Sequence, residues 1–151
     1  MEAPSGMEKE EKLAPRLEDY LETIYLLESQ KRVARVKEIA QARGVKMPTV
    51  SEVLKRLSKK GYVLYESYGY VRTTKKGREY AQKLYRKHRA LITFLKDVLK
   101  LPKEVAEREG CLMEHHLSSE TVERIEKLTE YLKERGIDPF GDGNGSDTVD
   151  S

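Results

Sequence analysis

The stretch from Val36 to Thr74 constrains the fold more than any other part of the chain. It holds a short amphipathic segment that ends at Gly44, a second that begins near Pro48 and ends at Gly61, and then two alternating apolar runs. Glycine favours the left-handed conformation that ends a helix, and proline suits a first helical turn. Two short helices joined by such a turn and followed by a β-hairpin form a winged helix-turn-helix. We therefore predict this motif, with a small α+β domain without a DNA role as the alternative.

Helical periodicity surrounds this motif on both sides. Apolar residues three and four positions apart predict a helix over about 17–29 before it and a long helix over about 75–99 after it. Pro102 begins a fifth helix, and a sixth follows a cap at Ser118 or Ser119. The predicted fold class is mostly α with a small β-hairpin wing: a winged helix-turn-helix followed by a helical subdomain.

The two ends of the chain lack this periodicity. The first segment is polar and contains two prolines, and the tail "IDPFGDGNGSDTVDS" is rich in Gly, Asp and Ser, so both are predicted to be disordered. The predicted organisation is a disordered N-terminus over 1–15, a winged helix-turn-helix DNA-binding domain over 16–74, a helical domain over 75–136 and a disordered tail over 137–151.

Charge is distributed unevenly along the chain. Residues 31–89 contain 18 Lys and Arg against 4 Asp and Glu, whereas the rest contains 11 against 22, although the net charge of the whole is only +3. A basic block that coincides with the predicted winged helix is typical of a module that binds a polyanion such as nucleic acid. The alternative is a solvated helical surface that is merely rich in lysine.

Other features exclude several classes of protein. A membrane-spanning helix needs roughly 20 consecutive apolar residues, and the chain has no such run. The acidic N-terminus lacks the apolar core of a signal peptide. A single cysteine cannot form an internal disulfide, which suits a reducing compartment. We expect a cytoplasmic protein that has no membrane partner.

The predicted winged helix-turn-helix indicates which residues contact DNA. The second helix of the motif enters the major groove by its N-terminal residues. Hydroxyl groups there can reach phosphates or base edges, and Glu52 could accept a hydrogen bond from cytosine or simply face solvent. Basic side chains of this helix and of the wing suit phosphate contacts. The candidate DNA-binding residues are Lys46, Pro48, Thr49, Ser51, Glu52, Lys55, Arg56, Lys59, Arg72 and Lys75.

Residues able to bind a metal ion lie on three predicted helices. In "CLMEHHLS", Cys111, Glu114 and His115 occupy positions i, i+3 and i+4, so they share one helix face. Thiolate, carboxylate and imidazole are all metal ligands. The same face could instead be a core or dimer stripe in which the cysteine acts as a small hydrophobe. The candidates on the other two helices are Asp19, Glu22 and His88.

Four stretches resemble a known family of metalloregulators, typified by the diphtheria toxin repressor and the manganese transport regulator. They are "EDYLETIYLL", "GVKMPTVSEVLKRLSKKGYV", "TTKKGREYAQKLYRKHRALITFL" and "CLMEHHLS", and the resemblance runs from about Leu17 to Arg135. It implies a homodimer that binds double-stranded operator DNA and represses metal-uptake or metal-homeostasis genes when Fe(II) or Mn(II) is bound. It also implies that 75–136 is a metal-binding and dimerisation domain.

The resemblance assigns the candidate ligands to two branches of the family. Asp19 and Glu22 look like carboxylate ligands of the manganese-sensing branch, whereas Cys111 matches the iron branch. The site is therefore a hybrid, with Fe(II) as the first choice of metal, Mn(II) as the second, and Co(II), Ni(II) and Zn(II) as surrogates. The ligands that both branches share match His88, Glu114 and His115.

Two departures from the iron branch are also expected. Ile92 stands where its ancillary metal site has a glutamate, and Glu107 stands where it has a histidine, so that site cannot form in the same manner. Longer members continue into an SH3-like domain. This chain ends near the point where that domain would begin, so no SH3-like third domain is expected.

Two other functions remain as alternatives. The first is a metal-independent winged-helix repressor whose C-terminal helices only dimerise. The second is an enzyme with a mononuclear metal centre, which needs an open coordination position and a general acid or base. The chain has no glycine-rich phosphate loop, nucleophile elbow or "HExxH". We therefore expect neither an enzyme nor a small-molecule substrate.

The C-terminal helices are expected to form most of the dimer interface, with apolar faces such as Val122, Ile125, Leu128 and Leu132 at or near it. Of the two residues that flank the candidate ligands, Met113 is expected in the core and His116 in a structural or interface role.

Overall fold

The computed structural model describes residues 11–31, 33–66 and 69–141. The disorder predicted for 1–10 and 142–151 lies outside the described residues. The chain divides into two compact units, Met1–Arg78 and Glu79–Ser151, and each is described by itself.

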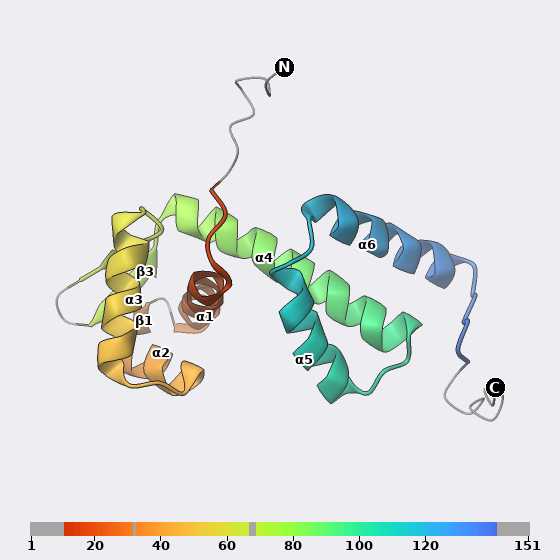
Figure 1. Cartoon of the computed structure of the whole chain (residues 1–151), viewed down its shortest axis with the longest axis horizontal. Helices are drawn as coiled ribbons and strands as arrows, with labels where there is room; N and C mark the ends of the chain where they lie inside the picture. The colour runs from red at the N-terminus through yellow and green to blue at the C-terminus, as the bar shows by residue number, and fades with distance from the viewer. Residues whose placement is uncertain (1–10, 32, 67–68, 142–151) are drawn as a thin grey trace, which may run out of the picture. The chain divides into compact units, whose positions relative to one another are not determined.

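The first unit is a winged helix-turn-helix, as the sequence predicts. Its three strands form an antiparallel sheet in the order β1-β3-β2, in which Ala34 pairs with Val71 and Val63 pairs with Thr73. The residues Ala34 and Arg35, directly before the helix-turn-helix, thus form a third strand of the sheet. The elements in chain order (Figure 1) are α1 Pro15–Lys31, β1 Ala34–Arg35, α2 Val36–Arg43, α3 Met47–Lys59, β2 Val63–Tyr65 and β3 Tyr70–Thr73.

Local signals explain the helix-turn-helix. Gly44 ends α2 in the left-handed conformation (φ 68°), where its N–H bonds back to the carbonyls of the last helical turn. Pro48 lies in the first turn of α3, as expected. The apolar stripe of α3 is completely buried, and its members are Val50, Val53, Leu54 and Leu57.

The segment before α1 is ordered further back than the sequence predicts. Leu13, placed in the predicted disordered N-terminus, is only 2% exposed, and α1 already begins at Pro15. Leu13 stands four positions before Leu17, in step with the apolar face of α1, so local spacing did carry a signal for its burial. The prediction of disorder was therefore wrong for residues 11–15.

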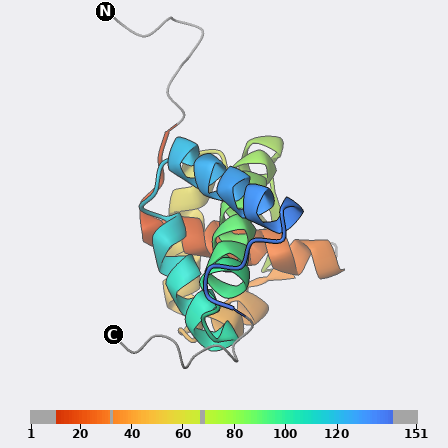
Figure 2. The ribbon, with the colours of Figure 1, turned by 90° about the vertical axis from the view of Figure 1, so that its right-hand side faces the viewer.

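The second unit consists of helices (Figure 2), and the long helix predicted over 75–99 is not uniform. Its end is a π-helical turn in which the N–H of Leu99 bonds to the carbonyl of Phe94, five residues earlier, and Lys100 then takes a positive φ of 59°. The elements are α4 Lys75–Thr93, which begins in the first unit, the π-helix η1 Phe94–Val98, α5 Lys103–Glu114 and α6 Ser119–Glu134. Ser118 caps α6 by accepting the N–H of Thr121.

Two of the residues predicted at or near the dimer interface pack within this unit. Val122 is 5% exposed and packs with Ala90 and Leu91 of α4, and the partly buried Ile125 packs against the same cluster. The dimer interface itself stays a prediction. Leu128, at 46% exposure, is the predicted interface residue that remains largely accessible.

Close helix packing in the same unit depends on Gly110. A Cβ atom at this position of α5 would lie 2.9 Å from the Cγ1 atom of Ile92 on α4. Glycine at this point therefore allows α5 to approach α4 at Ile92. Within the described ranges, none of the helices has the length and apolar character needed to cross a membrane.

Candidate functional site

Helix α3 presents a cationic face on the side opposite its buried stripe. Lys55, Arg56 and Lys59 are exposed, as are Arg72 of the wing and Lys75 at the start of α4. In the described part of the chain, these five side chains form no ion pair with an acidic group. Unpaired basic groups in this arrangement are suited to the phosphate backbone of DNA.

The N-terminal part of α3 is less uniform. Pro48 and Glu52 are exposed, together with Lys46 just before the helix, while Thr49 is half-buried. Ser51 is half-buried as well, and its Oγ lies 3.3 Å from the hydroxyl of Tyr65 on β2. Direct DNA contact by Ser51 stays a prediction, and in the free protein this hydroxyl joins α3 to the wing.

A second link to the wing comes from α1 and was not predicted. The carboxylate of Glu28 accepts two hydrogen bonds from Thr73 at the end of β3, one from the hydroxyl at 2.6 Å and one from the backbone N–H at 3.2 Å. The sequence did carry a signal for this contact. Glu28 lies seven positions after Leu21 and four positions after Ile24, so it extends the buried face of α1. A carboxylate in that position needs hydrogen-bond donors.

Three of the predicted metal ligands lie together in the second unit. His88 projects from α4, and Cys111 and Glu114 project from α5, with one ligand atom of each within 4.8 Å of the others. Nδ1 of His88 is 2.5 Å from Oε1 of Glu114. The remaining oxygen, Oε2 of Glu114, is buried and has no hydrogen-bond partner in the described part of the chain. A buried carboxylate oxygen without a donor is costly, so this set fits a bound cation, and its N, O and S atoms fit a transition metal.

His115 lies beside this group but outside the helix. The structure ends α5 at Glu114, earlier than "CLMEHHL" suggests, and His115 is its C-cap with α-helical angles. Its side chain is 5% exposed, and its Nε2 is 3.9 Å from the free Oε2 of Glu114. Met113 packs against the core as expected, whereas the side chain of His116 is exposed.

The two remaining predicted ligands belong to the first unit. Asp19 and Glu22 both lie on α1, and Oδ2 of Asp19 is 3.5 Å from a guanidinium nitrogen of Arg43 at the end of α2. Arg43 also lies over the ring of Tyr20, 5.4 Å from its centroid. That Asp19 and Glu22 complete the set of His88, Cys111, Glu114 and His115 stays a prediction.

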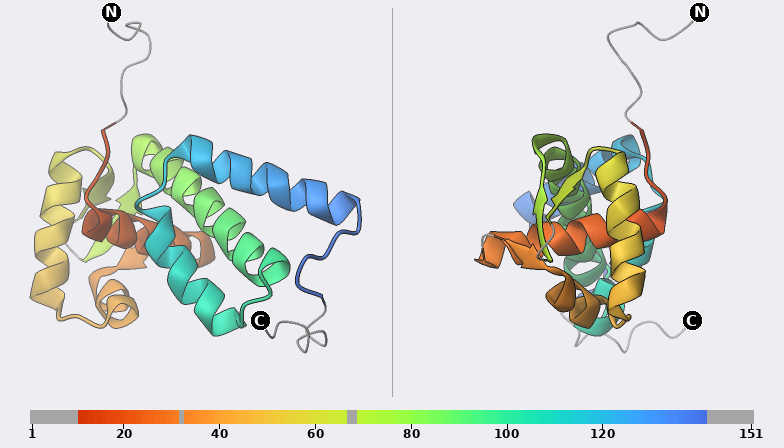
Figure 3. Two further views of the ribbon diagram at one scale, coloured as in Figure 1. Left: turned by 45° about the vertical axis from the view of Figure 1, so that its right-hand side comes forward. Right: turned by 90° about the vertical axis from the view of Figure 1, so that its left-hand side faces the viewer.

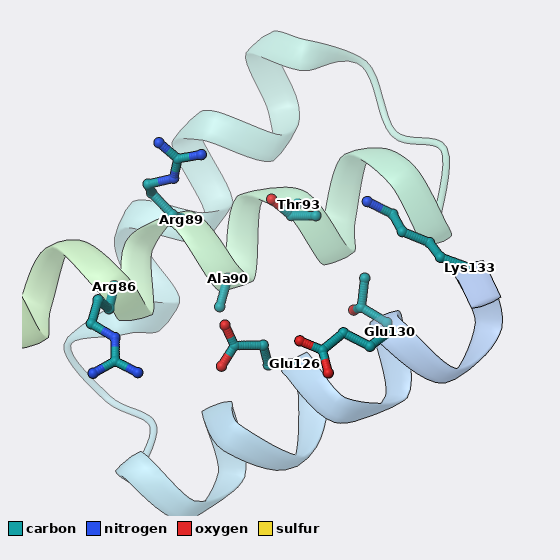
Figure 4. A pocket seen from close by; sticks show the side chains of 8 residues that line it. Arg86, Arg89, Ala90, Thr93, Glu126, Glu130 and Lys133 are labelled. Carbon is teal, nitrogen blue, oxygen red and sulfur yellow. The ribbon is translucent and has the colours of Figure 1, made fainter.

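A groove of about 330 Å³ in the second unit offers no competing site for a transition metal (Figure 4). It lies between α4 and α6, and neither histidine nor cysteine lines it. Its charged lining residues are Arg86, Arg89, Glu126, Glu130 and Lys133.

Comparison with known proteins assigns both units. Residues 12–75 match the family model described as iron dependent repressor, N-terminal DNA binding domain. Residues 74–143 match the model described as iron dependent repressor, metal binding and dimerisation domain.

Individual relatives support the same assignment. The chain is 36% identical over 124 residues to an HTH-type transcriptional regulator of Methanocaldococcus jannaschii, covering 82% of this chain and 99% of the relative. It is 38% identical over 120 residues to the HTH-type transcriptional regulator MntR of Geobacillus kaustophilus, covering 80% and 84%. Among solved structures, the manganese regulator SloR matches with a TM-score of 0.69 and 36% identity over 79% of this chain. This chain covers 55% of the SloR chain, so it spans about half of that protein.

Proposed function

The chain belongs to the iron-dependent repressor family, and we propose that it represses metal-homeostasis genes by binding operator DNA as an Fe(II)- or Mn(II)-loaded homodimer. The family consists of DNA-binding transcriptional regulators, so the chain is a regulator rather than an enzyme. The match to a metal-binding and dimerisation domain also disfavours a metal-independent repressor. A protein that acts on chromosomal DNA works in the cytoplasm, where we place it.

One observation carries the proposal beyond family membership. Glu114 is fully buried, yet one of its carboxylate oxygens has no hydrogen-bond donor among the described residues, while the ligand atoms of His88 and Cys111 lie within 4.8 Å. Burying a carboxylate without compensation is unfavourable. A divalent cation would supply that compensation. These three residues are therefore the part of the proposed site that the second unit already brings together.

The complete site that we propose also includes ligands from α1. Asp19 and Glu22 would join His115 and the three residues above, so that the ion connects the DNA-binding unit to the dimerisation unit. A metal would then favour one placement of the two α3 helices in the homodimer, and helix spacing decides whether both can enter the major groove. Fe(II) is our first choice, because the set mixes one thiolate with harder oxygen and nitrogen donors, and Mn(II) is the second.

A binding assay tests this function directly. The protein is stripped with a chelator and mixed anaerobically with a pool of labelled random duplexes, with or without added Fe(II) or Mn(II). We expect the metal to raise DNA retention markedly and to enrich two-fold symmetric sequences. Equal binding in the presence of the chelator would instead support the metal-independent repressor.

The choice of metal can be tested at Cys111. Replacing Cys111 with serine removes the one soft donor and is expected to weaken binding of Fe(II), Co(II) and Zn(II) more than binding of Mn(II). Anaerobic metal titrations of wild type and Cys111→Ser measure this difference. If all four ions lose affinity by the same factor, Cys111 is a packing residue and the preference for Fe(II) has no basis in the site.

A further inference from the structure

The residues before α1 make a specific contact with the end of α3. Oε2 of Glu11 accepts a hydrogen bond from Nζ of Lys60 at 2.8 Å, and Oε1 accepts one from the hydroxyl of Tyr62 at 3.2 Å. We call residues 11–14 the N-terminal arm. The arm is anchored by Leu13, which is 2% exposed. Figure 3 shows this arm, in red, passing alongside the yellow α3.

Lys60 extends the cationic face of α3. It follows the last helical residue as the C-cap with α-helical angles, so it lies four positions after Arg56 on the same face. Lys76, from the first turn of α4, donates a hydrogen bond to the carbonyl of Lys60 at 2.9 Å, and its ammonium lies 4.4 Å from the centroid of the Tyr62 ring. Glu11 therefore places a carboxylate at the end of a row of basic groups.

The surroundings of Glu11 favour the charged form of its carboxylate. The hydrogen bond from Lys60 is the main cause that lowers the pKa of Glu11, and the positive charges of Lys60 and Lys76 and the hydrogen bond from Tyr62 act in the same direction against partial desolvation. At neutral pH Glu11 is an anion held by an ammonium group and a hydroxyl group.

Lysine side chains supply many of the contacts that bind a DNA phosphate. We propose that Lys60 forms a phosphate-binding site of the DNA-binding surface, and that Glu11, held also by the hydroxyl of the buried Tyr62, occupies this site in the free protein. Glu11 is then an intramolecular competitor that must be displaced before a phosphate binds. This inference rests on the proposed DNA-binding function. It adds that the residues before α1 limit the affinity of the protein for DNA.

The test compares charge-removing variants in the metal-loaded full-length protein. Glu11→Gln keeps the shape and the hydrogen-bonding ability of the side chain but removes its charge. Because the ion pair of Glu11 with Lys60 is exposed and therefore weak, the variant is expected to bind a short labelled duplex only about two- to five-fold more tightly at low salt. A non-specific duplex suffices as the probe, because phosphate contacts dominate non-specific binding. Fluorescence anisotropy measures Kd.

Two controls separate competition from a general charge effect. Glu79→Gln removes the same charge from an exposed residue of α4 whose side chain forms no hydrogen bond or ion pair with the described residues, and it is expected to change Kd by less than Glu11→Gln. In a Lys60→Met background, Glu11→Gln is expected to lose most of its effect on Kd, because the ammonium group for which Glu11 and the phosphate compete has been removed.

Three results would overturn the inference: an unchanged Kd for Glu11→Gln, an equal gain for Glu79→Gln, or an undiminished gain in the Lys60→Met background. Thermal unfolding of each variant shows whether it has kept its fold. If metal-loaded wild type fails to bind duplex DNA at low salt, the proposed function is wrong and this inference falls with it. That result is distinct from normal DNA binding that Glu11 does not affect.

Discussion

Replacing Gly77 with alanine is expected to lower the free energy of unfolding of the DNA-binding unit by about 3 kcal/mol, at the upper end of the usual range for overpacking. A Cβ atom on Gly77 would overlap the carbonyl oxygen of Tyr62 and lie 2.9 Å from its carbonyl carbon. Backbone atoms cannot rotate away as a side chain can, and the same carbonyl accepts the N–H of Thr74. The new methyl group must therefore push α4 away from the wing.

Urea unfolding followed by circular dichroism measures this effect, with Arg78→Ala as the matched control. Arg78 is the exposed neighbour of Gly77 in the same helical turn, so its replacement tests alanine substitution without the overlap. We expect the control to shift stability by no more than about 0.5 kcal/mol. Equal midpoints for Gly77→Ala and wild type would show that the start of α4 moves freely relative to Tyr62.

The second large effect is expected at Glu114. Replacing Glu114 with glutamine should lower Fe(II) and Mn(II) affinity by more than about 100-fold, which is the upper end for residues that only support a ligand. DNA binding should then no longer respond to metal. Stability of the metal-free protein should stay the same or rise, because glutamine keeps an acceptor for His88 and removes a buried charge with an unsatisfied oxygen.

A metal ligand and a packing residue respond differently to this substitution. Loss of a ligand lowers metal affinity without lowering the stability of the metal-free protein, whereas loss of a packing residue lowers that stability. Metal titration and thermal unfolding without metal give the two quantities for the same variant. Glu109→Gln is the control, since Glu109 is exposed on the same helix and should alter neither. Full metal affinity in Glu114→Gln, or a large loss of stability without metal, would remove Glu114 from the proposed site.

Local chemistry made most of the fold predictable. Gly44 and Pro48 bracket a turn that few other residues would form, and the periodic apolar residues of α3 are the ones that the structure buries. Pairing between distant segments could not be predicted. Ala34 joins the sheet because it pairs with Val71, which lies far from it in the sequence.

The candidate site shows the same division. The spacing of Cys111 and Glu114 placed both on one helix face, and the structure keeps them there. Their proximity to His88 could not follow from spacing, because 26 residues and a π-helical turn separate His88 from Glu114. That grouping came from the family resemblance. Neither route revealed the hydrogen bonds of Glu11, because an isolated carboxylate in the sequence resembles any solvated acid.

If Asp19 binds the metal, as we propose, its ion pair with Arg43 sets two cations in competition for one carboxylate. Arg43 is the last residue of α2, directly before the Gly44 turn that leads into α3, and it already lies 3.5 Å from Asp19. A divalent ion at Asp19 would replace an interaction that Arg43 holds in the free protein. Equilibria that share a group in this way are reciprocally linked. Any contact that draws Arg43 away, a DNA phosphate included, would therefore raise the affinity of Asp19 for metal.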